Sequence, residues 1–410
     1  MTVRRWLIVA GLAGVIHNLL RLLAGSLGAP WGLFNYLHPF HVNIAKFAPL
    51  PTACVFGILA LLLWAAWRGW HRPQDESSKS LWGSALWAGV ATVPLGVFAV
   101  AASTLMERTY GWTLFLVVPF FSGFMSALLL GQRRKINRGD AALVSSLAVL
   151  LLGGALIAVA IEGAVCLIMA LPIALPLALI GGLLGYGVLH LSAAQNPAMF
   201  LLIAGLTPFS AGLEHAFLPA NDLFSVTTAI DLPAAPALVW QTILEPAKLS
   251  PPSHALFRAG VAYPLASHIE GVGASATRYC DFSTGRLVEP VLIWDHQRQL
   301  RFTVASNPLP MQEWTPYAQI HPPHLEGFLV SRQGEFRLTA LPNGGTHLEA
   351  TTWYQHHLAP AHYWRWWSDY IIHRVHEMVL ENIRERALNR ASRESAGASP
   401  AAPAHRAPKG

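Results

Sequence analysis

Residues 335–354 read EFRLTALPNGGTHLEATTWY, and this stretch decides the fold of the C-terminal half of the chain. Two arms in which polar and apolar residues alternate, Glu335–Leu341 and Thr346–Tyr354, flank the turn sequence Pro-Asn-Gly-Gly. Asn-Gly supplies the positive φ angles that a tight hairpin turn requires, so the stretch predicts an antiparallel β-hairpin. Because Phe336 and Leu338 alternate with polar side chains, we expect one face of the sheet to pack against another element and the other face to be exposed to solvent.

The cover is predicted to be the last helix of the chain, at about residues 361–388. Its apolar side chains recur mostly every three or four residues, at Trp364, Trp367, Ile371, Val375, Met378 and Ile383. This spacing predicts one apolar ridge along a helix of about 40 Å, long enough to lie across a whole curved sheet. Residues 390–410 are rich in Ala, Pro, Ser and Arg and lack apolar side chains for packing, so we expect a disordered basic tail.

Further strands are predicted upstream of the hairpin, where short strand-like runs are separated by turn residues. These runs are Ser225–Asp231, Ala266–Glu270, Ala274–Phe282, Leu287–Asp295, Leu300–Ala305 and Gly327–Ser331. Pro236 precedes a short helix, Ala237–Leu244, directly after the first strand. A strand, short helices, antiparallel strands and one long C-terminal helix make an α+β helix-grip arrangement. A curved sheet around one helix leaves an apolar cavity, which is the usual form of a small-molecule site.

Residues 224–389 also carry an ordered series of motifs. They are Ile230-Asp-Leu-Pro-Ala-Ala-Pro-Ala-Leu-Val-Trp240, Gly271-Val-Gly-Ala-Ser, Arg278-Tyr-Cys-Asp-Phe-Ser-Thr-Gly285, Glu289-Pro290, Trp294-Asp295, Pro308-Leu-Pro-Met311 and the hairpin. In this order they resemble the START-like and polyketide-cyclase superfamily (SRPBCC), in a bacterial membrane-attached branch. The resemblance implies an apolar-ligand cavity between the sheet and the C-terminal helix. It implies no shared chemistry, because members bind lipids, quinones, hormones or polyketides and only some are enzymes.

Aromatic and polar residues near the expected cavity are the candidates for ligand binding. They are Trp240, Arg278, Glu289, Trp294, Trp314, Tyr317, His321, His324, Tyr354, Trp364 and Trp367. Arg278 and Glu289 fall on adjacent predicted strands, where they form either an ion pair that orients a polar ligand head or an exposed pair worth under about 1 kcal/mol. The rigid sequence from His321 to His324 is either a gate at the cavity mouth or a plain surface loop. The tryptophans line the cavity or fill the core.

Catalytic and metal-binding residues are harder to identify from the sequence. Asp369, Tyr370 and His373 lie close together on the last helix and could form an acid–base group that faces the cavity, with a plain helix surface as the alternative. Histidines three residues apart on a helix, such as His373 and His376, can share a metal ion, but a third ligand must come from elsewhere. We therefore expect no metal ion and no cofactor.

The N-terminal half has a different composition. Residues 1–220 hold 12 of the 28 Lys and Arg residues but only 6 of the 22 Asp and Glu residues, so the formal charge of +6 lies entirely in this half. Long apolar runs separate the basic residues, which indicates loops that orient membrane spans and not a face that binds nucleic acid. The runs long enough to cross a bilayer as an all-α bundle of six or seven helices are Trp6–Leu27, Thr52–Trp70, Leu81–Ser103, Trp112–Leu130, Ala141–Ile161, Ala164–Leu189 and Met199–Phe217.

The basic loops predict the orientation of this bundle. The densest basic cluster, at residues 133–138, falls on the same side as the earlier basic loops, and by the positive-inside rule that side is cytoplasmic. Seven spans then place the C-terminal domain on the opposite face, which is periplasmic for a bacterial inner membrane, whereas six spans reverse the result. Glu162, at the turn between the fifth and sixth spans, either pairs with a basic residue such as Arg21 or sits at the membrane surface.

Three functions fit these features. The first is membrane-anchored binding or transfer of a hydrophobic ligand, such as a lipid, an isoprenoid or a polyketide-like molecule, in the helix-grip cavity. The second is a cyclase- or hydrolase-like enzyme that acts on a lipid-soluble substrate, and the third is a non-catalytic ligand sensor. The sequence favours the first, with a hydrophobic small molecule and the membrane as partners and with no nucleic acid.

Overall fold

The computed structural model describes residues 81–101, 103–104, 110–189, 222–317, 320 and 322–397. The chain divides into two compact units. The helical unit comprises residues 1–220, 313–326 and 357–363, and the sheet unit comprises residues 221–312, 327–356 and 364–410. The predicted spans Trp6–Leu27, Thr52–Trp70 and Met199–Phe217 lie outside the described residues, as does His321. Residues 313–326 and 357–363, which we expected in the C-terminal domain, group with the helices instead.

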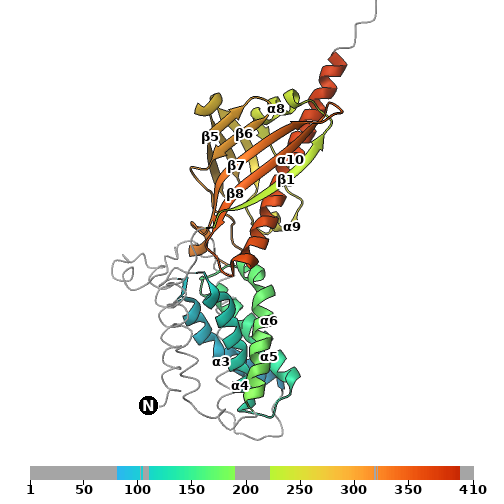
Figure 1. The fold of residues 1–410 in the computed structure, drawn as a ribbon. Coiled ribbons are helices and arrows are strands. Elements are labelled where there is room, and N and C mark those ends of the chain that lie inside the picture. Colours follow the sequence, from blue (N-terminus) through green and yellow to red (C-terminus); the bar gives the residue numbers. More distant parts are fainter. Residues whose placement is uncertain are drawn as a thin grey trace, which may run out of the picture. The chain divides into compact units, whose positions relative to one another are not determined.

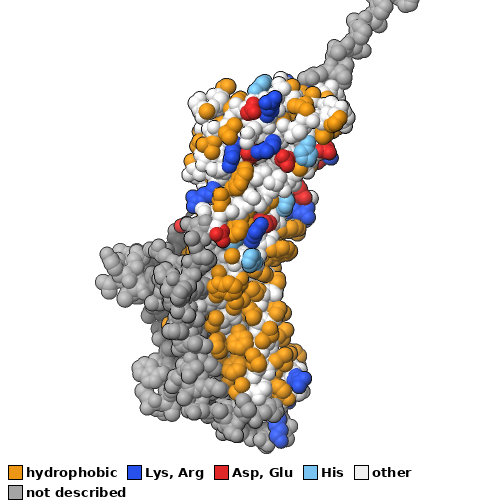
Figure 2. All heavy atoms as spheres, viewed as in Figure 1, with side chains coloured by type: hydrophobic (Ala, Val, Ile, Leu, Met, Phe, Trp, Pro, Cys, Tyr) orange, Lys and Arg blue, Asp and Glu red, His pale blue; other side chains and the backbone are white. Residues whose placement is uncertain are grey.

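Four helices among the described residues are long and apolar enough to cross a membrane. They are α3 (Leu81–Ala101), η3 with α4 (Thr113–Val117 and Val118–Gly131), α5 (Arg138–Ala158) and α6 (Ala164–Val188). These helices lie within a few residues of the corresponding predicted spans. Large apolar side chains such as Phe98, Leu150 and Ile168 are exposed on them, and Figure 2 shows hydrophobic side chains gathered over this unit. Apolar surface of this extent is typical of a face that contacts lipid or protein.

Helices α4 and α6 pack with their backbones in close approach. A Cβ atom added at Gly123 would collide with the backbone of Ala178, and one added at Gly181 would collide with the carbonyl of Phe120. Small residues at such crossings allow the close van der Waals packing that holds helices together in lipid. These glycines therefore fix how α4 and α6 pair.

The described strands of the sheet unit form one eight-stranded antiparallel sheet in the order β1-β8-β7-β6-β5-β4-β3-β2 (Figure 1). The strands are β1 (Phe224–Leu232), β2 (Ala247–Lys248), β3 (Pro264–Glu270), β4 (Thr277–Phe282), β5 (Gly285–Asp295), β6 (Gln299–Thr303), β7 (Leu329–Ala340) and β8 (Thr346–His356). The helices are α8 (Pro236–Leu244), α9 (Ala255–Arg258) and α10 (Ala361–Gly397). The predicted class, apolar helices followed by a curved antiparallel sheet that packs on a long C-terminal helix, is confirmed.

Strand β7 differs from its prediction. The sequence predicts two separate strands here, Gly327–Ser331 and Glu335–Leu341, but the structure has one strand with a register shift before Gln333. A β-bulge of this kind adds a residue without ending the pairing, so it interrupts the alternation on which the prediction relied. The predicted hairpin itself is confirmed, with Ala340 paired with Thr346 across the turn.

Helix α10 buries a different ridge from the predicted one. The buried positions are Trp364, Ser368, His376, Leu380, Ile383 and Ala387. Trp367, Ile371, Val375 and Met378, which the prediction placed on the ridge, are half-buried. The prediction counted apolar side chains alone, whereas the real ridge includes polar ones that find hydrogen-bond partners. The helix also continues to Gly397, past residue 390, where the tail was expected to begin.

Candidate functional site

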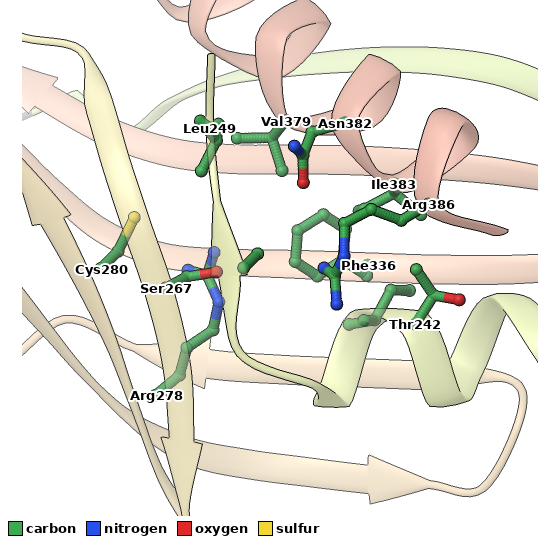
Figure 3. A pocket seen from close by; sticks show the side chains of 12 residues that line it. Thr242, Leu249, Ser267, Arg278, Cys280, Phe336, Val379, Asn382, Ile383 and Arg386 are labelled. Carbon is green, nitrogen blue, oxygen red and sulfur yellow. The ribbon is translucent and has the colours of Figure 1, made fainter. Parts of the chain in front are cut away.

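A cavity lies between the sheet and α10 in the sheet unit (Figure 3). Its walls combine apolar side chains from α8, β7 and α10 with the polar side chains of Ser267, Arg278 and Asn382. Its volume is about 20 Å³ for the centre of a water-sized molecule. That is room for about one water. A hollow beneath α10 therefore exists, but it is nearly closed.

Arg278 and Glu289 form a buried ion pair at one wall of this cavity. They stand opposite each other in the register of β4 and β5, and Arg278 Nη1 donates a hydrogen bond to Glu289 Oε2. The two residues are 7% and 3% exposed, so the expectation of an exposed pair is wrong. The guanidinium also lies over the rings of Phe302 and Phe336, at 5.2 and 5.6 Å from their centroids. Burial raises the pKa of Glu289, while the adjacent guanidinium favours the ionised carboxylate.

The four candidate tryptophans of the sheet unit lie away from this cavity. Trp240 is 1% exposed and packs edge-on against Trp294, with ring centroids 5.7 Å apart. Trp364 is buried and Trp367 is half-buried on the first turns of α10. None of the four belongs to the described side chains that line the cavity. These rings fill the core and its margin.

The candidate acid–base residues have separate partners. Asp369 Oδ1 accepts a hydrogen bond from the buried hydroxyl of Tyr354 at 2.6 Å. The hydroxyl of Tyr370 pairs with a histidine that precedes α9, and His373 Nδ1 pairs with a threonine of β1 at 2.6 Å. Each side chain is thus held by a different neighbour. No hydrogen bond described in the structure joins Asp369, Tyr370 and His373 into one catalytic group.

The predicted gate residues belong to the helical unit. The backbone N–H of Ala164 donates to the carbonyl of Trp314 at 2.8 Å, and the Tyr317 hydroxyl donates to the carbonyl of Ala158. Trp314 is exposed, whereas Tyr317 and His324 are buried. The segment 313–326 is therefore bound to the end of α5 and the start of α6, and the alternative of a plain surface loop is wrong.

Polar side chains gather in the helical unit where α5 ends and α6 begins. We name Tyr110, Glu162, Cys166, Glu313 and His324 the Glu162 cluster. Glu162 accepts a hydrogen bond from the Tyr110 hydroxyl at 2.8 Å and lies 3.5 Å from His324 Nδ1, while Cys166 Sγ lies 2.8 Å from His324 Nε2. Glu162 is 6% exposed and lies at the turn between α5 and α6, so its carboxylate is buried among its neighbours, while Arg21 lies outside the described residues.

Glu313 joins its own segment to the first turn of α6. Its carboxylate accepts hydrogen bonds from the backbone N–H groups of Val165 at 3.0 Å and of Cys166 at 3.2 Å. The first N–H groups of a helix lack intrahelical partners and carry partial positive charge, so a carboxylate is favoured there. A side chain at Gly163 would collide with Glu313, so this approach requires a glycine directly before the helix.

Burial dominates the electrostatics of the Glu162 cluster. It raises the pKa of Glu162 to about 8 and lowers the pKa of His324 to about 3. Burial also raises the pKa values of Glu313 and Tyr110. His324 is therefore a neutral imidazole near pH 7, and a neutral imidazole has a lone pair available for a hydrogen bond or a metal ion.

Sequence patterns do not bring this cluster together. They place Glu162 in a turn and Cys166 in an apolar run, and no pattern singles out Glu313. One signal was present, because an acidic residue at the boundary of two spans is costly unless it has a partner. The partners of Glu162 are Tyr110, which lies 52 residues earlier, and His324 in the segment 313–326, so no local pattern could identify them.

Comparisons with known proteins find distant matches among solved structures. No protein-family model and no curated protein matches the chain. Among solved structures, the chain is similar to a Thalictrum flavum norcoclaurine synthase point mutant at 9% identity and a TM-score of 0.28, covering 42% of this chain and 99% of that one. A protein from Nitrosospira multiformis (13% identity, TM-score 0.26) and Ara h 8.0201 (11%, 0.26) each cover 41% of this chain and 99% of their own.

Proposed function

We propose that the sheet unit binds a small hydrophobic molecule with an oxygen-bearing head, such as a lipid or an isoprenoid, beneath α10. The observation that carries this proposal is the buried Arg278–Glu289 pair on the cavity wall. Removing two charges from water costs several kcal/mol per ion, and apolar replacements of such a pair are often neutral or stabilising. Stability alone therefore does not explain the pair, whereas recognition of a polar head does.

The guanidinium of Arg278 can orient such a head. An arginine presents five N–H donors in a planar fork, and one on Nη1 donates to Glu289. Figure 3 shows the Arg278 side chain turned toward Ser267 at the cavity. A carbonyl, carboxylate or phosphate oxygen in the cavity would accept from the remaining donors. The apolar part of the ligand would then contact side chains such as Phe336 and Val379.

The cavity has to widen before such a ligand enters. Arg386 of α10 lines it, and this side chain donates to the carbonyl of Pro246 at 3.2 Å and lies 3.5 Å from a carboxylate oxygen of Glu245. Glu245 is half-exposed, and exposed pairs of this kind contribute under about 1 kcal/mol. Rotation of Arg386 away from the cavity is therefore a low-cost way to open it.

The helical unit supports a membrane location for the same chain. Its described helices are apolar over membrane-spanning lengths. The basic loop at residues 133–138 precedes α5, whereas Glu162 and the segment 313–326 lie at the other end of that helix. If the basic loop is cytoplasmic, the segment 313–326 faces the opposite, periplasmic side. Anchoring raises the effective concentration of a binding domain near lipid-soluble ligands.

The test is mass spectrometry of lipids that co-purify with the full chain in mild detergent. We expect a bound amphiphile with the natural chain. The double variant Arg278→Met with Glu289→Leu should retain about 10- to 100-fold less, the cost of losing a charged hydrogen bond. The matched control, Arg286→Met with Asp281→Leu, removes an exposed pair on the same two strands and should retain the ligand.

A second variant tests the position of the ligand. Val379→Trp fills the cavity from α10, while Glu385→Trp places the same ring on an exposed position of that helix. The first should lose the ligand and the second should keep it. A natural chain that carries no amphiphile, or equal retention by the two tryptophan variants, would count against the proposal.

A further inference from the structure

We propose that the Glu162 cluster is a closed structural site for a transition-metal dication such as Zn²⁺, held by Glu162, Cys166 and His324. A carboxylate oxygen, a thiolate and an imidazole nitrogen are the ligand types that Zn²⁺ takes in proteins. One donor atom from each of these three residues lies within 4.8 Å of the other two. Ligand atoms around a tetrahedral zinc ion lie about 3.5 Å apart, so small side-chain rotations bring all three into range.

An unsatisfied imidazole nitrogen points to the same ligand. His324 is 8% exposed, and its Nδ1 has no hydrogen-bond partner among the described residues. A buried polar atom without a partner is costly and calls for an explanation. The neighbouring carboxylate oxygen of Glu162 lies 3.5 Å from this nitrogen, a separation that suits two ligands of one ion.

The charges around the cluster also favour a cation. Two carboxylates and one thiol converge on a single imidazole, and the described ion pairs of Glu162 and Glu313 involve His324 and no Lys or Arg. Buried acidic groups are normally paired with a cation or bound to a metal ion. Glu313 Oε1 lies 4.0 Å from His324 Nε2, so a second carboxylate adds to the negative charge around the cluster.

A catalytic thiol fits the same residues less well. Cys166, His324 and Glu162 follow the order of nucleophile, base and orienting carboxylate. A thiol of that kind needs free N–H groups to stabilise a developing oxyanion. The N–H groups of Val165 and Cys166 at the start of α6 instead donate to the carboxylate of Glu313. An anion already occupies the position where an oxyanion would form.

The proposed ion would fasten residues 313–326 to the turn between α5 and α6. Tyr110 acts as a positioning residue, because its hydroxyl donates to Glu162 Oε1 and leaves Oε2 facing His324. Groups that orient metal ligands in this way typically change metal affinity by 10- to 100-fold when they are removed. Tyr110→Phe keeps the ring that packs edge-on against His324 and removes only the hydroxyl.

The test uses the full chain in detergent, stripped with a chelator and titrated with Co²⁺ as a spectroscopic substitute for Zn²⁺. We expect one Co²⁺ per chain and a near-ultraviolet sulfur-to-cobalt charge-transfer band. Cys166→Ser should abolish the band, while Cys280→Ser, which removes a thiol in the sheet unit, should keep it. Tyr110→Phe should keep the band and raise the Kd for Co²⁺ by about 10- to 100-fold.

A second readout needs no variant. Zn²⁺ should slow alkylation of Cys166 in the natural chain by about tenfold or more, measured by peptide mass spectrometry with Cys280 as the internal reference. This measurement remains decisive if Cys166→Ser fails to fold. Absence of stoichiometric Co²⁺ binding, a band that survives Cys166→Ser, or alkylation of Cys166 that is indifferent to Zn²⁺ would each overturn the proposal.

Discussion

The sheet unit should lose stability in mild acid through one buried histidine on α10. His376 is 7% exposed, and its two ring nitrogens pair with hydroxyls of β1 and β8, Thr228 at 3.1 Å and Thr352 at 2.8 Å. Burial, with a smaller effect of the neighbouring His373, lowers the pKa of His376 to about 4. An unfolded histidine has a pKa of about 6.5, so between these values the unfolded chain binds the proton more tightly.

The sign and the size of the effect follow from this difference. Stability from His376 is fully present above about pH 7 and is lost as the pH falls through 6.5 toward 4. The loss amounts to about 2 kcal/mol at pH 5 and about 3 kcal/mol below pH 4. Marginal stability of 5–15 kcal/mol is typical of domains, so the change is large enough to measure.

Pulse proteolysis of the full chain in urea, at pH 7.5, 6 and 5, measures the free energy of unfolding of the sheet unit. His376→Gln removes the titrating group, so its free energy of unfolding should fall by about 2 kcal/mol less than that of the natural chain between pH 7.5 and 5. His296→Gln, on an exposed position after β5, is the control and should follow the natural chain. Equal pH dependence for His376→Gln and the natural chain would refute the reasoning.

Two further predictions concern packing. Arg278→Met alone leaves the charge of Glu289 buried and should lower the free energy of unfolding by about 3–5 kcal/mol in the same assay. Arg286→Met, at an exposed pair, should change it by under about 1 kcal/mol, and similar values for both would contradict the buried-pair argument. Gly181→Leu should lower the thermal midpoint of the helical unit by about 2–8 °C. At Gly187 an added Cβ meets no atom of the described residues within 4 Å, so Gly187→Leu should leave the thermal midpoint unchanged, and equal shifts for the two variants would contradict the close helix crossing.

The fold could be predicted from the sequence because its signals are local. The Asn-Gly turn identified the hairpin, and long apolar runs identified α3 to α6. The predicted buried ridge of α10 was wrong where a polar side chain is buried because it forms hydrogen bonds with other elements of the fold. His376 lies on the buried ridge of α10 because β1 and β8 offer it hydroxyl groups, and no count of apolar residues reveals those partners.

The candidate sites could be predicted only in part. Arg278 and Glu289 were identified because strand order places them side by side, and the structure shows that the pair is buried. His324 was a candidate from the sequence, but the residues that surround it could not be predicted, because its neighbours Glu162 and Cys166 lie more than 150 residues earlier in the chain. A contact over such a distance depends on the packing of the segment 313–326 against α5 and α6, which sequence spacing does not encode.

Two histidines, His376 and His324, are equally buried but differ in the partners of their ring nitrogens. His376 and His324 are 7% and 8% exposed, and burial lowers the pKa of each. Both nitrogens of His376 have neutral hydroxyl partners, so its hydrogen bonds are complete and a structural role accounts for it. His324 instead has a thiol at one nitrogen and a carboxylate too distant for a hydrogen bond at the other. Because those two neighbours are metal ligands and the hydroxyls of Thr228 and Thr352 are poor ones, the cluster around His324 is where a cation is expected.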